Sequence, residues 1–164
     1  MSEFERLVDV IGELRGDNGC PWDKEQTHES LKRYCIEEAS EVIAGIDIMS
    51  ETGNATNLCE ELGDLLLQVV LHAQIAKEEG LFDIEDVAKS IADKMVRRHP
   101  HVFSDAKLES LDEVHETWEA VKKQEKSGKE WMEAYLPRAF SESEEYIQAA
   151  RERKGLKRVD LNDK

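Results

Sequence analysis

The sequence is poor in the residues that interrupt secondary structure. It holds 3 Pro and 9 Gly in 164 residues, and aromatic side chains make up only 6% of it. Because proline and glycine break helices and strands, their scarcity predicts long uninterrupted elements. The abundance of Glu, Lys, Leu and Ala favours helices over strands. The length suits a single domain with a core of its own.

A cysteine framework and a membrane segment are also missing. Cys20, Cys35 and Cys59 are odd in number, and no two of them have C-x-x-C spacing. This pattern excludes a disulfide scaffold, gives no zinc site and is typical of reduced thiols. No apolar run reaches the roughly 20 residues of a membrane helix, and the acidic amino terminus is unlike a signal peptide. We therefore expect a cytoplasmic protein with no membrane partner.

Positive charge is scarce. Lys and Arg number 22 against 37 Asp and Glu, which gives a formal net charge of −15. A surface of this charge repels polyanions, so nucleic acid is not an expected partner. A small anionic substrate stays compatible with the sequence if cations bridge it to the protein.

Apolar residues recur at helical spacing along most of the chain, and no period-two strand pattern occurs. The pattern predicts helices over residues 2–14, 27–49, 57–79, 84–98 and 110–128, and from 141 into a basic tail. Ser110 with Glu113, and Ser141 with Glu144, have the spacing of capping boxes and mark two helix starts. We expect an all-α protein with a four-helix core and a C-terminal helical extension.

Residues 16–23 are rich in turn formers and predict a loop. Trp22 is unusual in such a segment. It either covers the core or forms a flat wall beside a ligand, where its ring could stack.

The helix expected at 57–79 is apolar on nearly every side between Leu62 and Ala76. A helix of this kind is buried all round, and one small bundle offers too little surface to cover it. We therefore expect a homodimer, or a dimer of dimers, formed through helices.

Carboxylates occur where apolar residues are expected. Glu38 interrupts the apolar stripe of the helix at 27–49, Glu41 follows one turn later, and Glu37 completes an E-E-x-x-E motif. Glu61 and Asp64 repeat the i, i+3 spacing on the next helix, with Gly63 between them allowing a close backbone approach.

If the two helices pack antiparallel, four carboxylates converge. Uncompensated negative charges cannot share a buried site, so they must be paired, protonated or metal-bound. Ligand sets made only of oxygen select Mg²⁺ or Mn²⁺ over zinc. The sequence thus predicts a metal site at Glu38, Glu41, Glu61 and Asp64, and a structural salt-bridge cluster is the alternative.

Basic residues cluster at the C-terminal end of the helix expected at 84–98. Lys94, Arg97 and Arg98 stand just before His99-Pro100-His101. Cations at a helix C-terminus are favourable in themselves. In a protein of this net charge, they also suggest a clamp for phosphate oxygens.

Together these motifs resemble MazG-type nucleoside triphosphate pyrophosphohydrolases. The resemblance spans about residues 3–126 and includes W-E-x-V-K-x-x-E-K from Trp118. It rests on G-C-P-W-D at 19–23, E-E-A-S-E at 37–41, E-L-G-D at 61–64 and D-K-M-V-R-R-H-P-H-V-F at 93–103. It implies an all-α, dimeric, Mg²⁺-dependent enzyme that cleaves an NTP to NMP and diphosphate.

The resemblance also assigns roles to residues. Glu38, Glu41, Glu61 and Asp64 match the metal ligands, Lys94 and Arg98 match the basic pair, and Arg97 and Trp22 are further candidates for substrate contacts. Glu37 or Glu38 would contact the attacking water. We expect a MazG-type domain over residues 1–126 and a helical extension over 127–164. The single E-E-x-x-E motif resembles the N-terminal copy of members that carry two such domains in tandem.

Two other functions fit an acidic helical protein. A ferritin-like di-iron protein would need E-x-x-H motifs on two helices. Glu25 with His28 has that spacing at a loop-to-helix junction, and Asp112 with His115 is a weaker copy. A non-catalytic helical interaction module is the second alternative, and it would bind no metal.

Overall fold

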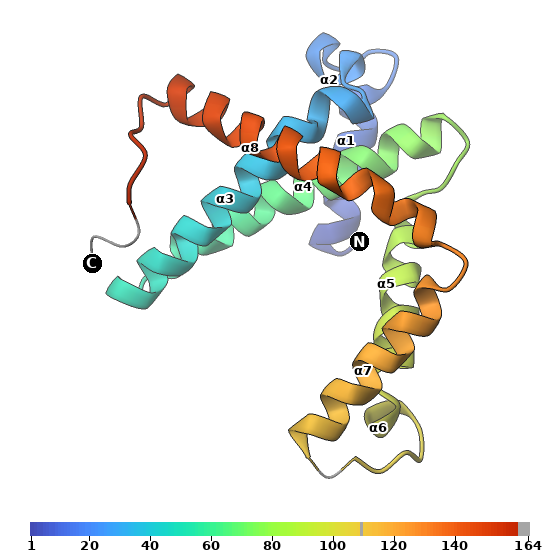
Figure 1. Cartoon of the computed structure of the whole chain (residues 1–164). Helices are drawn as coiled ribbons and strands as arrows, with labels where there is room; N and C mark the ends of the chain where they lie inside the picture. The colour runs from blue at the N-terminus through green and yellow to red at the C-terminus, as the bar shows by residue number, and fades with distance from the viewer. Residues whose placement is uncertain (109, 161–164) are drawn as a thin grey trace. The chain divides into compact units, whose positions relative to one another are not determined.

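The computed structural model describes residues 1–108 and 110–160. Over these residues the chain forms α-helices and a 3₁₀ helix, η1, and no strand (Figure 1). This confirms the predicted all-α class. The elements in order are α1 (Glu3–Arg15), α2 (Pro21–Glu25), α3 (His28–Thr52), α4 (Thr56–Glu78), α5 (Ile84–Arg98), α6 (Pro100–Phe103), α7 (Leu111–Lys126), η1 (Glu130–Tyr135) and α8 (Leu136–Arg153).

Most helix starts follow the local signals in the sequence. Ser110 caps α7 in a complete capping box with Glu113, as predicted. Asp83 caps α5 in the same manner, and its side chain accepts hydrogen bonds from the backbone of Glu85 and Asp86. Gly53 ends α3 with a positive φ of 75°, a conformation that glycine adopts without strain.

Two expectations about local structure are wrong. Residues 21–25 form the short helix α2 instead of the end of a loop, because Pro21 occupies its first turn, where proline is favoured. The last helix begins at Leu136, so Ser141 lies inside α8 and does not mark its start. Pro137 marks the start better than the Ser141–Glu144 spacing does. Residues 161–164 of the expected extension lie outside the described residues.

The chain divides into two compact units. The first contains residues 1–81 together with the chain from Ala139 onward, and the second contains residues 82–138. Of the four helices expected in one core, α1, α3 and α4 belong to the first unit and α5 belongs to the second.

The centre of the first unit is the hairpin of α3 and α4, which run side by side (Figure 1). Gly45 of α3 permits their close approach, because a Cβ there would stand 2.9 Å from the Cα of Leu58. The expectation for Gly63 is wrong, since a Cβ built at that position meets nothing within 4 Å. The largest fully buried side chains are Leu31 and Val70, one from each helix.

Arg15 fixes the amino-terminal helices to this hairpin. Its Nη2 donates to a carboxylate oxygen of Glu78 at 2.7 Å, and its Nη1 donates to the backbone oxygens of Asp23 and Gln26 at 2.5 and 3.1 Å. The Arg15 side chain is only 6% exposed. One buried guanidinium thus joins the end of α1 and the C-terminal end of α2 to the end of α4.

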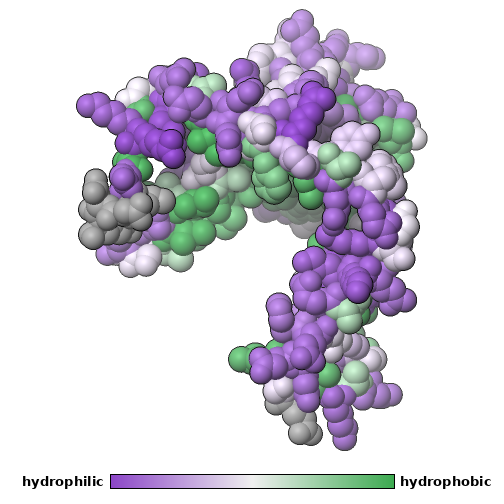
Figure 2. Space-filling model, in the orientation of Figure 1, coloured by the Kyte–Doolittle hydropathy of each residue, from purple (hydrophilic) through white to green (hydrophobic). Residues whose placement is uncertain are grey.

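The α3–α4 hairpin keeps part of its apolar surface exposed. Ile43, Ile46, Leu62, Leu66 and Val69 are each more than a third exposed. Hydrophobic residues gather along these two helices in Figure 2. In the part of the chain that the structure describes, no helix combines the length and apolar character needed to cross a membrane.

Candidate active site

Three of the four predicted metal ligands meet between α3 and α4. Glu38, Glu61 and Asp64 each offer a carboxylate oxygen, and these oxygens lie within 4.8 Å of one another. Glu61 also accepts a hydrogen bond from Nδ2 of Asn57 at 2.7 Å, one turn earlier on α4. The hairpin therefore brings Glu38 of α3 together with both acids of the Glu61–Asp64 pair on α4.

The environment of Glu38 makes its negative charge costly. Partial burial raises the pKa of this carboxyl above its ordinary value, and the charges of Glu41, Asp64, Glu37 and Glu61 raise the pKa further. A divalent cation would remove this cost, and an all-oxygen donor set suits Mg²⁺ or Mn²⁺. The residues present thus fit such an ion.

The other two acids of the E-E-x-x-E motif pair with Arg153, the last residue of α8, and with Lys154, which follows it. Nη2 of Arg153 donates to both carboxylate oxygens of Glu37 at 2.5 Å, and Nζ of Lys154 lies 3.2 Å from Glu37. Lys154 also donates to Glu41. The bond from Arg153 holds the pKa of Glu37 below its usual range. Sequence reasoning missed Arg153 and Lys154, whose only signal was a basic stretch in an acidic chain.

Trp22 lies on α2 with about half of its surface exposed. Its ring meets Tyr34 of α3 edge-on, with 6.3 Å between the ring centroids. Because Tyr34 precedes Glu38 by one helical turn, Trp22 stands on the same side of α3 as the acids. About half of the indole is thus accessible, and the role of Trp22 beside a ligand stays a prediction.

The basic residues belong to the second unit. Arg97 and Arg98 each donate two hydrogen bonds to the carboxylate of Glu125 on α7. The shortest run from Nη2 of each arginine, at 2.9 Å for Arg97 and 2.7 Å for Arg98. The Arg98 guanidinium also lies over the ring of Trp118, 4.9 Å from its centroid. Lys94 lines an open hollow along α5 with Phe82 and Ile91. Arg98 is therefore held in one orientation by a carboxylate and an aromatic ring, neither of which sequence reasoning had assigned a role.

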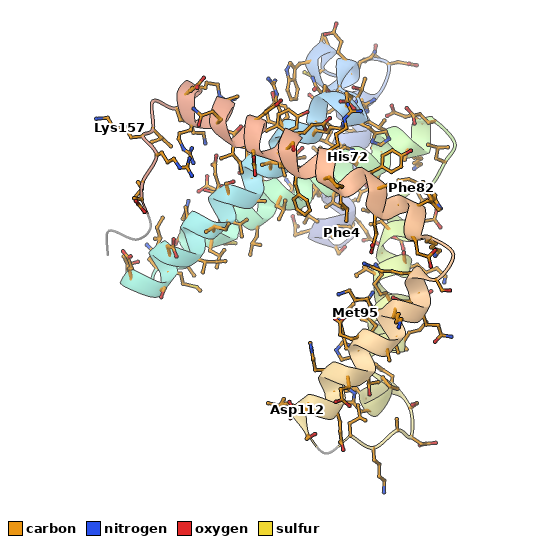
Figure 3. All side chains as sticks on the ribbon, viewed as in Figure 1. Phe4, His72, Phe82, Met95, Asp112 and Lys157 are labelled. Atoms are coloured by element: carbon orange, nitrogen blue, oxygen red, sulfur yellow. The ribbon has the colours of Figure 1, made fainter. Side chains whose placement is uncertain are left out.

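Among the described residues, the carboxylate cluster that could hold a metal includes none of the residues of the di-iron alternative, Glu25, His28, Asp112 and His115. Nδ1 of His28 lies 2.7 Å from Nδ1 of His72, and the two rings stack with 5.0 Å between centroids (His72 is labelled in Figure 3). Nε2 of His72 lies 3.5 Å from Sγ of Cys35. Nε2 of His28 lies 3.8 Å from a carboxylate oxygen of Glu79, and neither histidine is part of the cluster of Glu38, Glu61 and Asp64.

Parts of this chain are similar in sequence to known proteins. Residues 26–103 match the model of the MazG nucleotide pyrophosphohydrolase domain. The chain is 52% identical over 126 residues to the nucleoside triphosphate pyrophosphohydrolase/pyrophosphatase MazG of Thermotoga maritima, which covers 77% of the chain and 46% of that protein. It is 45% identical over 130 residues to the nucleoside triphosphate pyrophosphohydrolase of Escherichia coli K12, covering 79% and 48%.

A third relative, the uncharacterised protein YabN of Bacillus subtilis, is 54% identical over 128 residues, which make up 78% of the chain and 25% of YabN. The chain thus spans a quarter to a half of the length of the relatives it matches. The matched segment contains both acidic motifs and the basic end of α5. Residues 26–103 of this chain are therefore identified as a MazG nucleotide pyrophosphohydrolase domain.

Proposed function

We propose that this protein is a Mg²⁺-dependent nucleoside triphosphate pyrophosphohydrolase, which converts NTP and water to NMP and diphosphate. The observation that carries the proposal is the cluster of Glu38, Glu61 and Asp64 inside a MazG domain. Two relatives bear the name of this activity. Removal of unwanted triphosphates from the nucleotide pool would be its role.

The three clustered carboxylates, with Glu41 as a fourth, would hold Mg²⁺, and Mn²⁺ would substitute for it. The bound cation would supply positive charge to the phosphates and polarise the α-phosphorus. The chain's own residues would position the attacking water. Glu37 or Glu38 would accept a hydrogen bond from the attacking water and orient it in line with the α-phosphorus.

The basic residues of α5 would contact the leaving diphosphate. As the new bond from water oxygen to the α-phosphorus forms, the bond from that phosphorus to the bridging oxygen breaks, and diphosphate leaves with its electrons. Lys94 and Arg98 would stabilise the charge that develops on it, and Arg97 would bind a phosphate oxygen. Trp22 would form one wall of the site, beside the base of the nucleotide.

We further propose that the protein is a homodimer, or a dimer of dimers, joined through α3 and α4. The exposed apolar residues of the two helices support this assembly, since a contiguous apolar surface is costly in water. In this arrangement the four-helix core expected from the sequence would be completed between chains. The domain division at residue 126, the cytoplasmic location and the absence of a nucleic-acid partner stay predictions.

The test of function is a panel of nucleoside triphosphates with Mg²⁺ in ¹⁸O-labelled water, with the products separated. We expect NMP and diphosphate, with the label in NMP, because water attacks the α-phosphorus. Label in diphosphate would place the attack at the β-phosphorus. Release of NDP and phosphate, or no turnover of any nucleotide, would refute the proposal.

A further inference from the structure

The end of α8 brings an unusual concentration of positive charge to the acidic motif of α3. Residues 151–158 hold five of the chain's 22 Lys and Arg residues and a single acid, Glu152. Arg153 and Lys154 from this segment contact Glu37 and Glu41. In a chain of net charge −15, the cations that pair with these acids come from a segment more than a hundred residues away.

The position of these cations is defined by a helix cap. Gly155 has a φ of 67°, the amide of Leu156 donates to the oxygen of Arg151 at 2.9 Å, and the amide of Gly155 donates to that of Glu152 at 3.1 Å. These two bonds form the Schellman motif that ends many helices. Leu156 turns back as a result and lines a hollow with Ala150 of α8 and Ala44 of α3. The cap thus holds Lys154 at the acids.

Ion pairs link α8 and the residue after it to α3, beside the hollow that Ala44, Ala150 and Leu156 line. Besides Arg153 and Lys154, Lys32 of α3 pairs with Glu142 of α8 at 3.3 Å. The side chains of Lys154 and Glu41 are 39% and 34% exposed. Pairs with this exposure contribute little to stability, so water and salt can replace them. Glu37, the partner of Arg153, is only 11% exposed, so the pair of Lys154 and Glu41 is the one that water and salt replace most easily.

We propose that residues 151–156 form an autoinhibitory contact, in which the ammonium of Lys154 takes the place of a divalent cation on Glu41. The inference rests on the proposed function in one respect, because it takes Glu41 as the fourth metal ligand. While Lys154 occupies this carboxylate, the cluster among the described residues consists of Glu38, Glu61 and Asp64. A divalent cation at the cluster would repel Arg153 and Lys154, so metal binding and tail docking oppose each other.

The test measures Mn²⁺ binding by electron paramagnetic resonance without nucleotide. The wild type is compared with Arg153→Gln/Lys154→Gln. The matched control is Lys157→Gln/Arg158→Gln, which removes the same charge from the tail beyond α8 (Lys157 is labelled in Figure 3). We expect the first variant to bind Mn²⁺ roughly three- to tenfold more tightly than the wild type, and the control to match the wild type. At high salt the ratio should approach one, because the exposed pairs are screened.

A second measurement uses the wild type alone. Saturating Mn²⁺ should accelerate amide hydrogen exchange at the end of α8, around residues 150–156, while the exchange of the α4 core stays unchanged. Equal Mn²⁺ affinity in the wild type and Arg153→Gln/Lys154→Gln, or equal gains in both double variants, would overturn the autoinhibitory contact. So would exchange in α8 that Mn²⁺ leaves unchanged.

The two proposals fail in different ways. Tight Mn²⁺ binding that Glu38→Gln abolishes, combined with no effect of Arg153→Gln/Lys154→Gln, would leave the metal site standing and remove the tail contact alone. Absence of Mn²⁺ binding in the wild type and in every variant would remove the metal site and, with it, the contact that competes for it.

Discussion

Glu38 of α3 and Asp64 of α4 place carboxylate oxygens within 4.8 Å of each other across the helix hairpin. Each negative charge makes the other more costly, and the pKa of Glu38 is raised, first by burial and then by neighbouring acids that include Asp64. A folded protein tolerates such an arrangement when a cation offsets the charge.

Removing one charge from this pair should remove metal binding and activity. We expect Glu38→Gln and Asp64→Asn to lose at least about a hundredfold in kcat/KM, the scale of an essential electrostatic group. Far-UV circular dichroism should keep the helical signal. Glu60→Gln is the matched control, because Glu60 is adjacent to Glu61 on α4 and exposed. Full activity in either ligand variant would contradict the metal assignment.

The basic residues of α5 should affect the rate more than the fold. We expect Lys94→Ala and Arg98→Ala each to lose about 2–4 kcal/mol of transition-state stabilisation, since their charges would meet developing negative charge. Steady-state kinetics with Mg²⁺ and the preferred nucleotide measures the loss. Lys89→Ala serves as control, because this residue is exposed on the same helix and pairs with Asp93. Unchanged kcat/KM in Arg98→Ala would remove it from the site.

The exposed valine of α4 tests the assembly. Val69 is 39% exposed in the single chain, whereas Val70 is 1% exposed. We expect Val69→Glu to dissociate the dimer, and Val70→Glu to unfold the chain itself because it buries a charge. Light scattering at low micromolar concentration reports the first effect, and circular dichroism reports the second.

Lys77→Glu is the control, because Lys77 is exposed near the end of α4. Its neighbour Glu78 is unsuitable, since it pairs with Arg15. A wild type that is folded and active at 18.8 kDa would refute the dimer.

The pair of Arg15 and Glu78 predicts a pH dependence of stability. Hydrogen bonds from Arg15 are the main reason that the pKa of Glu78 is lowered. A lowered folded-state pKa contributes stability above the unfolded pKa, and this stability is lost as the pH falls through the folded value.

Glu78→Gln should therefore lower the melting temperature at neutral pH, where it leaves the buried Arg15 without its counter-ion. The difference in melting temperature between this variant and the wild type should vanish in acid, because there Glu78 of the wild type is protonated in both the folded and the unfolded chain. Thermal unfolding across a pH series measures this. Glu3→Gln, which removes an exposed pair with Arg6, should show little difference at any pH.

Local chemistry explains why the helices could be predicted. Capping at Asp83 and Ser110 depends on neighbours three residues away, and the apolar repeat of each helix is equally short in range. The same local rules misplaced the start of α8. Capping-box spacing at Ser141 also occurs inside helices, and only the fold decides which signal is used.

The sequence by itself determined the helical class, the faces on which Glu38 and Asp64 lie, and the oxygen donors that favour Mg²⁺. The tertiary structure decided which of the acids meet. Glu38, Glu61 and Asp64 cluster because α3 and α4 pack closely at Gly45, a contact that no local pattern specifies. Glu37 and Glu41 pair with Arg153 and Lys154, because ion pairs form between whatever charges the packing of distant helices brings together.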